Sequence, residues 1–273
     1  MFIPHRTPSR GNVIQRSIDL VGICWRLTSQ HPKLLLAHAL SLSSSFLAGW
    51  VFIVPHFFQM GILRALTGIL WLMCLASLGI VVGNAVLIVG AQRVLAGEEP
   101  SLREGFRVAF SRTPQLFGWV IISALVGTLI KAIQGLIERA SPLGGSAFGT
   151  TATIGWGLTT YFVLPLVVIE GQGPIEALRS STSLAGKSWV QQVLGDVSLG
   201  LAFLLMAIPG LFVVWMVWPS LMAFVLVLLY FAPLCIGYGT ASAIYQAALY
   251  RFALTGEVPH QFEPIFAPEV KPM

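Results

Sequence analysis

The chain has 273 residues, of which 56% are hydrophobic and only 10% are charged, and its mean hydropathy is +0.81. In a water-soluble domain about a quarter of the residues are charged, so these values exclude an ordinary soluble globular protein. The formal net charge of +5 fits either nucleic-acid binding or membrane topology, and the positions of the basic residues decide between the two.

The segment before the first long apolar stretch is polar and basic, and that stretch begins only at Leu34. A secretory signal peptide would place a short apolar core and a small-residue cleavage site earlier, so we expect the N-terminus to be retained. The three cysteines, Cys24, Cys74 and Cys235, lack the spacing of a zinc site or a disulfide framework. We therefore expect no metal, no cofactor and no disulfide.

Six apolar stretches are long enough to cross a membrane, because a bilayer core of about 30 Å needs about 20 helical residues. They cover approximately residues 34–54, 66–91, 117–137, 150–169, 193–215 and 221–244. The connections between them are short, and the extramembrane segments are too short to bury a core of their own. The sequence therefore predicts six transmembrane helices.

Most of the 16 lysines and arginines fall in the N-terminal segment, in the connections after the second and fourth spans, and in the tail. Basic loops remain in the cytoplasm, so both termini are predicted to be cytoplasmic. Tryptophan favours the membrane interface. One set of predicted span ends carries Trp50, Trp71, Trp156, Trp215 and Trp218, and the opposite set carries Trp119 and Trp189. The basic charge thus indicates topology, and no basic patch with stacking aromatics predicts nucleic-acid binding.

A helix-start signal precedes each pair of spans. Residues 12–15, 101–104 and 173–176 each place Glu or Gln three positions after a residue that suits a helix cap. Apolar stripes at helical spacing follow, at Ile14, Ile18, Val21 and Trp25, then at Leu102, Phe106, Ala109 and Phe110, and more weakly at Ile175, Leu178 and Ala185. Such amphipathic helices lie in the plane of the interface.

The predicted fold class is an all-α membrane protein. Its six transmembrane helices form three hairpins, each preceded by a cytoplasmic interfacial amphipathic helix. The approximate repeat units are 12–91, 101–169 and 173–250, followed by a cytoplasmic tail at 251–273. The prolines of this tail predict an extended segment that docks on the bundle or on a partner. We expect one transmembrane domain, because the connections are too short to separate the units.

Small residues and prolines inside the spans predict local packing features. Pairs four residues apart allow close helix contact, and they are Gly79 with Gly83 and Ser123 with Gly127. The prolines are Pro165, Pro209 and Pro233. Each is expected to kink or open its helix, either to shape a cavity or to improve packing.

Four polar residues within the predicted spans are candidates for a polar intramembrane site: Asp196, His38, Asn84 and Lys131. An ionisable group in the bilayer is a functional hypothesis by default. Each also has a structural interpretation. Asp196 is shallow enough to pair with Lys187, the long stem of Lys131 reaches the outer interface, and His38 and Asn84 suit ordinary interhelical hydrogen bonds.

Other charged residues are expected at the cytoplasmic surface. Candidates for contacts that dock the turn after the fourth span and the tail are Glu170, Arg179 and Arg251. Candidates for contacts with lipid headgroups are Arg16, Arg26, Arg103, Arg107 and Arg112. The second set lies in predicted interfacial helices, where arginine is attracted to anionic lipids.

No catalytic motif is present. The sequence contains no HExxH, no GxSxG, no phosphate-binding Walker loop and no pair of intramembrane aspartates. We therefore expect no catalytic residue and no enzymatic activity.

Two segments resemble signatures of a bacterial family of six-helix integral membrane proteins described only as a domain of unknown function. Residues 168–180, Val-Ile-Glu-Gly-Gln-Gly-Pro-Ile-Glu-Ala-Leu-Arg-Ser, are similar to its Glu-Gly-x-Gly-Pro-x-Glu-Ala-Leu-x-x-Ser signature, and residues 244–259 resemble its C-terminal signature. The chain departs from the family pattern after Ser180, where members often carry a Trp-containing stretch. The resemblance implies fold and location, namely the bacterial cytoplasmic (inner) membrane, and implies no mechanism.

The leading functional hypothesis is a structural, assembly or accessory subunit that interacts with membrane lipids, with other integral membrane proteins or with further copies of itself. Interfacial helices, small-residue faces and the scarcity of soluble mass motivate it. The alternative is a small transporter or channel with a polar site near Asp196.

Overall fold

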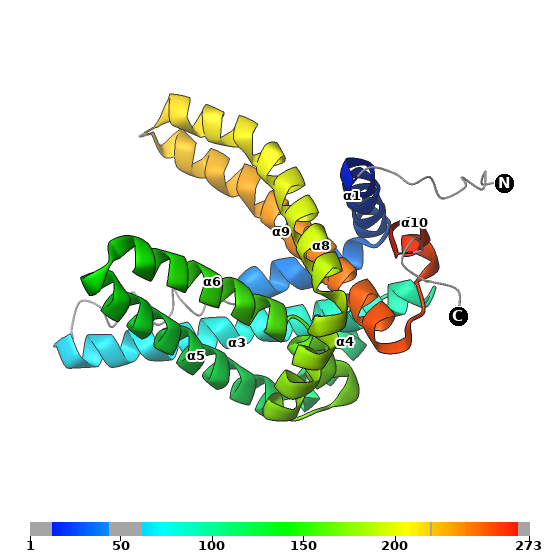
Figure 1. Ribbon diagram of the computed structural model, residues 1–273. Coiled ribbons are helices and arrows are strands. Elements are labelled where there is room, and N and C mark those ends of the chain that lie inside the picture. Colours follow the sequence, from blue (N-terminus) through cyan, green and yellow to red (C-terminus); the bar gives the residue numbers. More distant parts are fainter. Residues whose placement is uncertain (1–12, 44–61, 219, 267–273) are drawn as a thin grey trace. The chain divides into compact units, whose positions relative to one another are not determined.

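The computed structural model of the chain describes residues 13–43, 62–218 and 220–266 (Figure 1). Within these ranges the regular structure is helical and contains no strand, which confirms the all-α class. Five helical segments of the described residues are long and apolar enough to cross a membrane: Ser77–Leu95, Thr113–Ala140, Pro142–Glu170, Pro174–Val217 and Val225–Thr255. The chain is a membrane protein with several such helices. The predicted span at 34–54 is described only as helix over residues 32–43, and its remainder lies outside the described residues.

The longer helices are α1 (Val13–Gln30), α3 (Ile62–Leu95), α4 (Leu102–Ser111), α5 (Thr113–Ala140), α6 (Pro142–Thr160), α8 (Pro174–Val217) and α9 (Leu221–Thr255). The short ones are α7 (Val163–Pro165), the π-helix η1 (Leu166–Glu170), the 3₁₀ turn η2 (His260–Phe262) and α10 (Glu263–Phe266). The start of α4 follows the predicted capping box, because the hydroxyl of Ser101 accepts from the backbone N–H of Glu104 at 3.4 Å.

The described residues divide into two compact units that draw on non-consecutive segments. The first contains Met1–Leu35, Ala91–Pro100 and Val190–Met273, and the second contains Leu36–Gly90 and Ser101–Trp189. The first unit includes α1, most of α8, α9, η2 and α10. The second includes most of α3, together with α4, α5, α6, α7 and η1.

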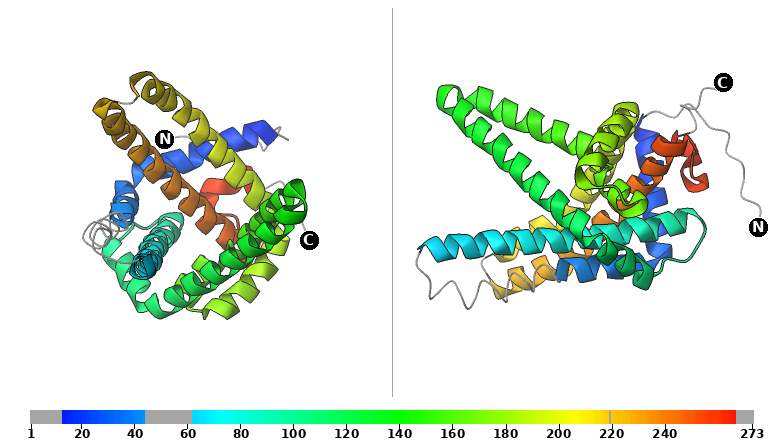
Figure 2. Two further views of the ribbon diagram at one scale, coloured as in Figure 1. Left: turned by 90° about the vertical axis from the view of Figure 1, so that its left-hand side faces the viewer. Right: turned by 90° about the horizontal axis from the view of Figure 1, so that it is seen from below.

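The predicted spans at 117–137 and 150–169 leave a connecting loop between them, and this part of the prediction is wrong. Helix α5 continues to Ala140 and α6 begins at Pro142, so only Ser141 joins them at the tip, from which the two helices diverge (Figures 1 and 2). The hydroxyl of Ser141 accepts from the N–H of Gly144 at 3.2 Å, and Pro142 occupies the first turn, where a missing N–H has no cost. Hydropathy underestimated this helix because its first two turns are rich in glycine and serine.

The predicted tryptophan levels also need correction in this pair. Trp119 of α5 and Trp156 of α6 were assigned to opposite faces of the membrane, yet their rings stack with centroids 6.0 Å apart. The early start of α6 explains the error, because it places Trp156 far from the N-terminal end of the helix and close to its C-terminal end at Thr160.

The third predicted interfacial helix does not exist as a separate element. Its start signal is right, since α8 begins at Pro174, but the helix runs without interruption to Val217. The serine-rich stretch does not break it, because the hydroxyls bond back to their own helix: Thr182 donates to the carbonyl of Leu178 at 2.8 Å and Ser188 to that of Leu184 at 3.1 Å. Only the first two start signals precede shorter helices.

The three prolines behave differently from one another. Pro209 and Pro233 lie inside α8 and α9, and both helices continue through them. Near Pro165 the helix does break, after Thr160. Ser181 of α8 repairs this break, since its buried hydroxyl accepts from the N–H of Phe162 at 3.1 Å and donates to the carbonyl of Thr159 at 2.6 Å.

Candidate functional site

Helix α1 has two apolar faces. One face is buried in the first unit and carries Leu20, Cys24 and Leu27, which are at most 7% exposed. The predicted stripe lies on the other face, where Ile14, Ile18 and Trp25 are 71%, 60% and 53% exposed. Burial raises the pKa of the Cys24 thiol to about 12, so this cysteine is a neutral core residue rather than a nucleophile.

The C-terminal segment folds back onto α9. The sequence predicted an extended tail, but residues 260–266 form η2 and α10. The rings of Phe262 and Phe266 are buried and lie 6.3 Å and 6.2 Å from the ring of Tyr245. Phe266 also stacks on Phe252, with centroids 5.0 Å apart and planes 5° from parallel. The tail was predicted to dock on the bundle or on a partner, and these rings dock on α9.

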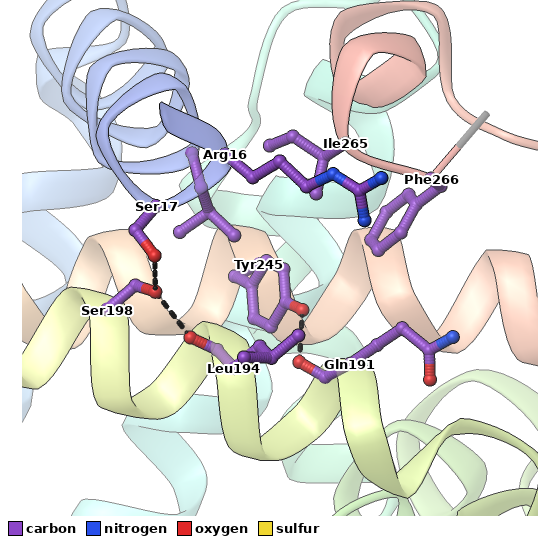
Figure 3. A pocket seen from close by; sticks show the side chains of 9 residues that line it. Arg16, Ser17, Gln191, Leu194, Ser198, Tyr245, Ile265 and Phe266 are labelled. Carbon is purple, nitrogen blue, oxygen red and sulfur yellow. Dashed lines mark hydrogen bonds between the residues drawn. The ribbon is translucent and has the colours of Figure 1, made fainter. Parts of the chain in front are cut away.

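A small cavity lies where α1, α8, α9 and α10 meet in the first unit (Figure 3). Its volume is about 40 Å³. Its lining residues are Arg16, Ser17, Leu20, Gln191, Leu194, Ser198, Tyr245, Ile265 and Phe266. The hydroxyls of Ser17 and Ser198 share a hydrogen bond of 2.7 Å, and Ser198 lies 2.5 Å from the carbonyl of Leu194. The site combines one cation, three hydroxyls and one amide side chain with apolar walls, which suits a ligand that carries both charge and hydrocarbon.

The four predicted intramembrane polar residues are divided between the two units. Asp196 belongs to the first unit, where it is half-buried in α8 and interacts electrostatically with Tyr238 of α9. His38 and Asn84 belong to the second unit. His38 is 8% exposed and its Nδ1 has no hydrogen-bond partner among the described residues, while Asn84 is half-buried in α3.

Lys131, the fourth candidate, lies in an exposed polar chain along α5. Its Nζ donates to Oε1 of Gln134 at 3.1 Å, and Nε2 of Gln134 donates to Oε1 of Glu138 at 2.7 Å. Gly145 and Gly149 of α6 face this chain closely: a Cβ at Gly145 would lie 2.6 Å from the backbone N of Glu138, and one at Gly149 would overlap the amide of Gln134. Gln134 and Glu138 therefore belong to the helix contact, and Lys131 is bonded to it through Gln134.

The turn between η1 and α8 is held by an arginine. Gly171 has a left-handed backbone with φ of 74°, and a side chain there would lie 2.5 Å from Nη2 of Arg112. Glu170, at the end of η1, is exposed. Arg112 was predicted to contact headgroups, but it is half-buried against this turn and its Nε lacks a hydrogen-bond partner among the described residues. Of the docking candidates, Glu170 adjoins the turn, and the headgroup candidate Arg112 lies against it.

The remaining basic candidates are mostly at the surface. Arg26, Arg103, Arg107 and Arg179 are exposed, and Arg16 is half-buried at the cavity. Arg251 is half-buried near the end of α9, where its Nη2 lies 3.7 Å from Oε2 of Glu257. This pair spans the end of α9 at Gly256, whose φ is 73°, and so supports the exit of the tail.

Sequence reasoning missed the glycine–tyrosine pairs that join α8 to α9. A Cβ at Gly195 would overlap the ring of Tyr245, and one at Gly210 would overlap the ring of Tyr230. Each tyrosine hydroxyl donates at 2.6 Å to the carbonyl four residues before its glycine, Gln191 for Tyr245 and Met206 for Tyr230. The equal spacing of the glycines in α8 and of the tyrosines in α9 is a sequence signal that could have revealed the pairs.

Neither a metal site among the described residues nor a similarity to a protein of known activity assigns chemistry to this chain. Among residues 13–43, 62–218 and 220–266, no group of three or more His, Cys, Asp or Glu side chains could hold a metal ion. The sequence model of a family of unknown function, DUF6159, matches residues 65–260. No curated protein and no solved structure matches the chain.

Proposed function

We propose that this chain, which belongs to the DUF6159 family of unknown function, is a structural or accessory component of the membrane that binds lipid and neighbouring membrane proteins. The two faces of α1 carry the proposal. The inner face is fixed to the first unit by Leu20, Cys24 and Leu27, so α1 is held as a part of the fold. The apolar residues on its outer face then remain available for something outside the chain.

Helix α4 of the second unit repeats this arrangement. Gly105 and Ala109 are buried, and a Cβ at Gly105 would lie 2.8 Å from Cγ1 of Val86. Phe110 is 64% exposed, with Arg103 and Arg107 exposed on the same helix. A short helix that packs by small residues and presents phenylalanine and arginine outward is suited to the headgroup region of a bilayer.

The location that we propose is the bacterial inner membrane, with both termini in the cytoplasm. The basic loops support this orientation, and the outward faces of α1 and α4 would then meet the cytoplasmic leaflet. Partners are lipids, other integral membrane proteins or further copies of the chain, and the proposal assigns a binding role rather than an enzymatic one.

Site-specific photo-crosslinking in native membranes tests the proposal. A photoreactive phenylalanine analogue replaces Ile18 on the outer face of α1 or, as the matched control, Gln30 on an exposed polar position of the same helix. We expect lipid adducts or discrete protein crosslinks at Ile18 and much less product at Gln30. Equal background at both positions, together with a strictly monomeric protein in mild detergent, would overturn the proposal.

A small transporter or channel is the second candidate, favoured by the half-buried Asp196 beside Tyr238 in the first unit. Proteoliposome flux of a broad solute panel tests it, comparing the wild type with Asp196→Asn. Flux above that of empty vesicles that Asp196→Asn abolishes would favour transport. Equal flux in both proteins would remove Asp196 from the mechanism.

A further inference from the structure

We propose that the cavity between α1, α8, α9 and α10 binds the phosphate of an anionic membrane lipid through Arg16. This inference rests on the proposed function and names the ligand of one site. Figure 3 shows the guanidinium of Arg16 reaching from α1 toward Phe266, over the space above Tyr245. The positive charge of the cavity therefore lies beside the ring of Phe266 and above that of Tyr245.

Among the described residues, the charge of Arg16 has no carboxylate partner, although the residue is half-buried. The acidic residue nearest in sequence is Asp19, and its Oδ1 takes a hydrogen bond from Gln15 at 3.2 Å. Because arginine stays protonated and a partly buried cation is costly without a partner, an anion at the cavity would be favourable.

The other polar groups of the cavity hold its walls in place. The Ser17–Ser198 hydrogen bond joins α1 to α8, and the hydroxyl of Tyr245 donates to the carbonyl of Gln191. The first bond fixes the segment of α1 that carries Arg16 against α8, and the second fixes α9 against α8. The guanidinium then presents a planar set of donors, which matches a phosphate better than a single point charge would.

The cavity volume limits what enters it. A water molecule requires about 10–15 Å³ measured in this way, so a cavity of about 40 Å³ admits roughly three atoms of water size. Two or three phosphate oxygens fit this space, and a complete lipid does not. The remainder of the ligand must therefore lie outside the cavity.

The apolar surroundings favour a lipid over a soluble anion. Leu20, Leu194 and Ile265 line the cavity beside Arg16. The outer face of α1, with Ile14 and Ile18 exposed, belongs to the same helix. A free phosphate would gain nothing from these apolar groups, whereas the glycerol and acyl parts of a lipid would contact them.

Native mass spectrometry of the full chain in mild detergent tests the inference. The protein is titrated with phosphatidylglycerol, with zwitterionic phosphatidylcholine as the lipid control and inorganic phosphate as the soluble control. We expect Arg16→Gln to weaken the tightest phosphatidylglycerol binding about tenfold, as loss of a charge-assisted hydrogen bond implies. The control Arg139→Gln, at an exposed arginine of α5 that is not among the candidate headgroup contacts, should change it less than about twofold.

A second variant keeps the inference testable if Arg16→Gln misfolds. Ile265→Trp fills the cavity and leaves Arg16 intact, so it should also weaken phosphatidylglycerol binding while the protein stays monodisperse. Unchanged binding in both variants would overturn the inference. Arg16-dependent binding of inorganic phosphate without lipid would overturn the lipid assignment in favour of a soluble anion. Because crosslinking at Ile18 tests the proposed function independently, failure at Arg16 would leave that function standing.

Discussion

In two pairs of long helices, α5 with α6 and α8 with α9, the helices of each pair contact one another at glycine residues. The groups that lie opposite the glycines differ between the two pairs. In the α8–α9 pair the groups are tyrosine rings, Tyr245 on Gly195 and Tyr230 on Gly210. In the α5–α6 pair, Gly145 faces the backbone of Glu138, and Gly149 faces the flexible side chain of Gln134.

The difference shows two ways in which lipid-embedded helices gain contact without a hydrophobic drive between them. In the α8–α9 pair, a rigid ring fills the gap at glycine and its hydroxyl is satisfied by a carbonyl of the facing helix. In the α5–α6 pair, close backbone approach allows a hydrogen-bonded chain of Lys131, Gln134 and Glu138 to lie against the partner helix. In the α8–α9 pair, substitution of either glycine would meet a tyrosine ring. In the α5–α6 pair, only substitution of Gly145 would meet backbone atoms of the facing helix.

Gly145→Ala is therefore expected to have the largest effect. Its Cβ would lie 2.6 Å from the backbone N and 2.8 Å from the Cα of Glu138, and neither atom can move by a rotamer change. We expect a loss of about 3 kcal/mol in the free energy of unfolding, measured in mixed detergent micelles. Gly155→Ala in the same helix is the control, because its Cβ meets nothing within 4 Å, and it should stay within about 0.5 kcal/mol of wild type. Similar values for the two variants would refute the close backbone contact.

Gly195→Ala should follow, with a loss of about 2 kcal/mol. The ring of Tyr245 cannot retreat, because it is buried, bonded to the carbonyl of Gln191 and packed against Phe262 and Phe266. Two control positions flank the comparison. Gly200→Ala meets nothing within 4 Å, and Gly237→Ala would make only an ordinary 3.5 Å contact with Phe203. If Gly195→Ala is as stable as these controls, the ring is not rigid and the contrast between the two pairs is lost.

Gly149→Ala should cost less, about 1 kcal/mol, since the side chain of Gln134 can move aside. That movement would break the hydrogen bonds of Gln134 to Lys131 and Glu138, which accounts for the remaining cost. In a Gln134→Ala background the same glycine substitution should therefore be nearly neutral, as a double-mutant cycle would reveal. Equal costs in both backgrounds would mean that Gly149 contacts something other than Gln134.

The sequence predicted the all-α membrane class and the starts of α4 and α8, because hydropathy and capping chemistry are local properties. The sequence-based prediction failed where a segment has low hydropathy and is nevertheless helical. The early part of α6 is rich in glycine, and after Leu178 the hydroxyls of Thr182 and Ser188 bond back within α8, so both segments continue as helix despite low hydropathy.

The candidate site was predictable only in part. Arg16 was identified as basic and interfacial, but its place beside Ser198 and Tyr245 depends on how α1 packs on α8 and α9, which no local pattern encodes. The stripe on α1 illustrates the same limit. Its periodicity was read correctly, whereas the second apolar face at Leu20, Cys24 and Leu27 is the one that the protein buries. A helix with two apolar faces leaves the inward face undetermined until its partner is known.

Tyr230→Phe and Tyr245→Phe should have the smallest effects and separate the two contributions of each ring. The substitution keeps the ring on the glycine and removes only the hydroxyl, whose acceptor carbonyl already belongs to a helix. Polar contacts between membrane helices contribute about 0.6 kcal/mol on average, so each variant should lose about that amount, measured by the same unfolding assay. Met222→Leu, an exposed position of α9, provides a control for substitution at a lipid-facing site. A loss as large as that of Gly195→Ala would mean that the hydroxyl, and not the fit of ring to glycine, holds α8 and α9 together.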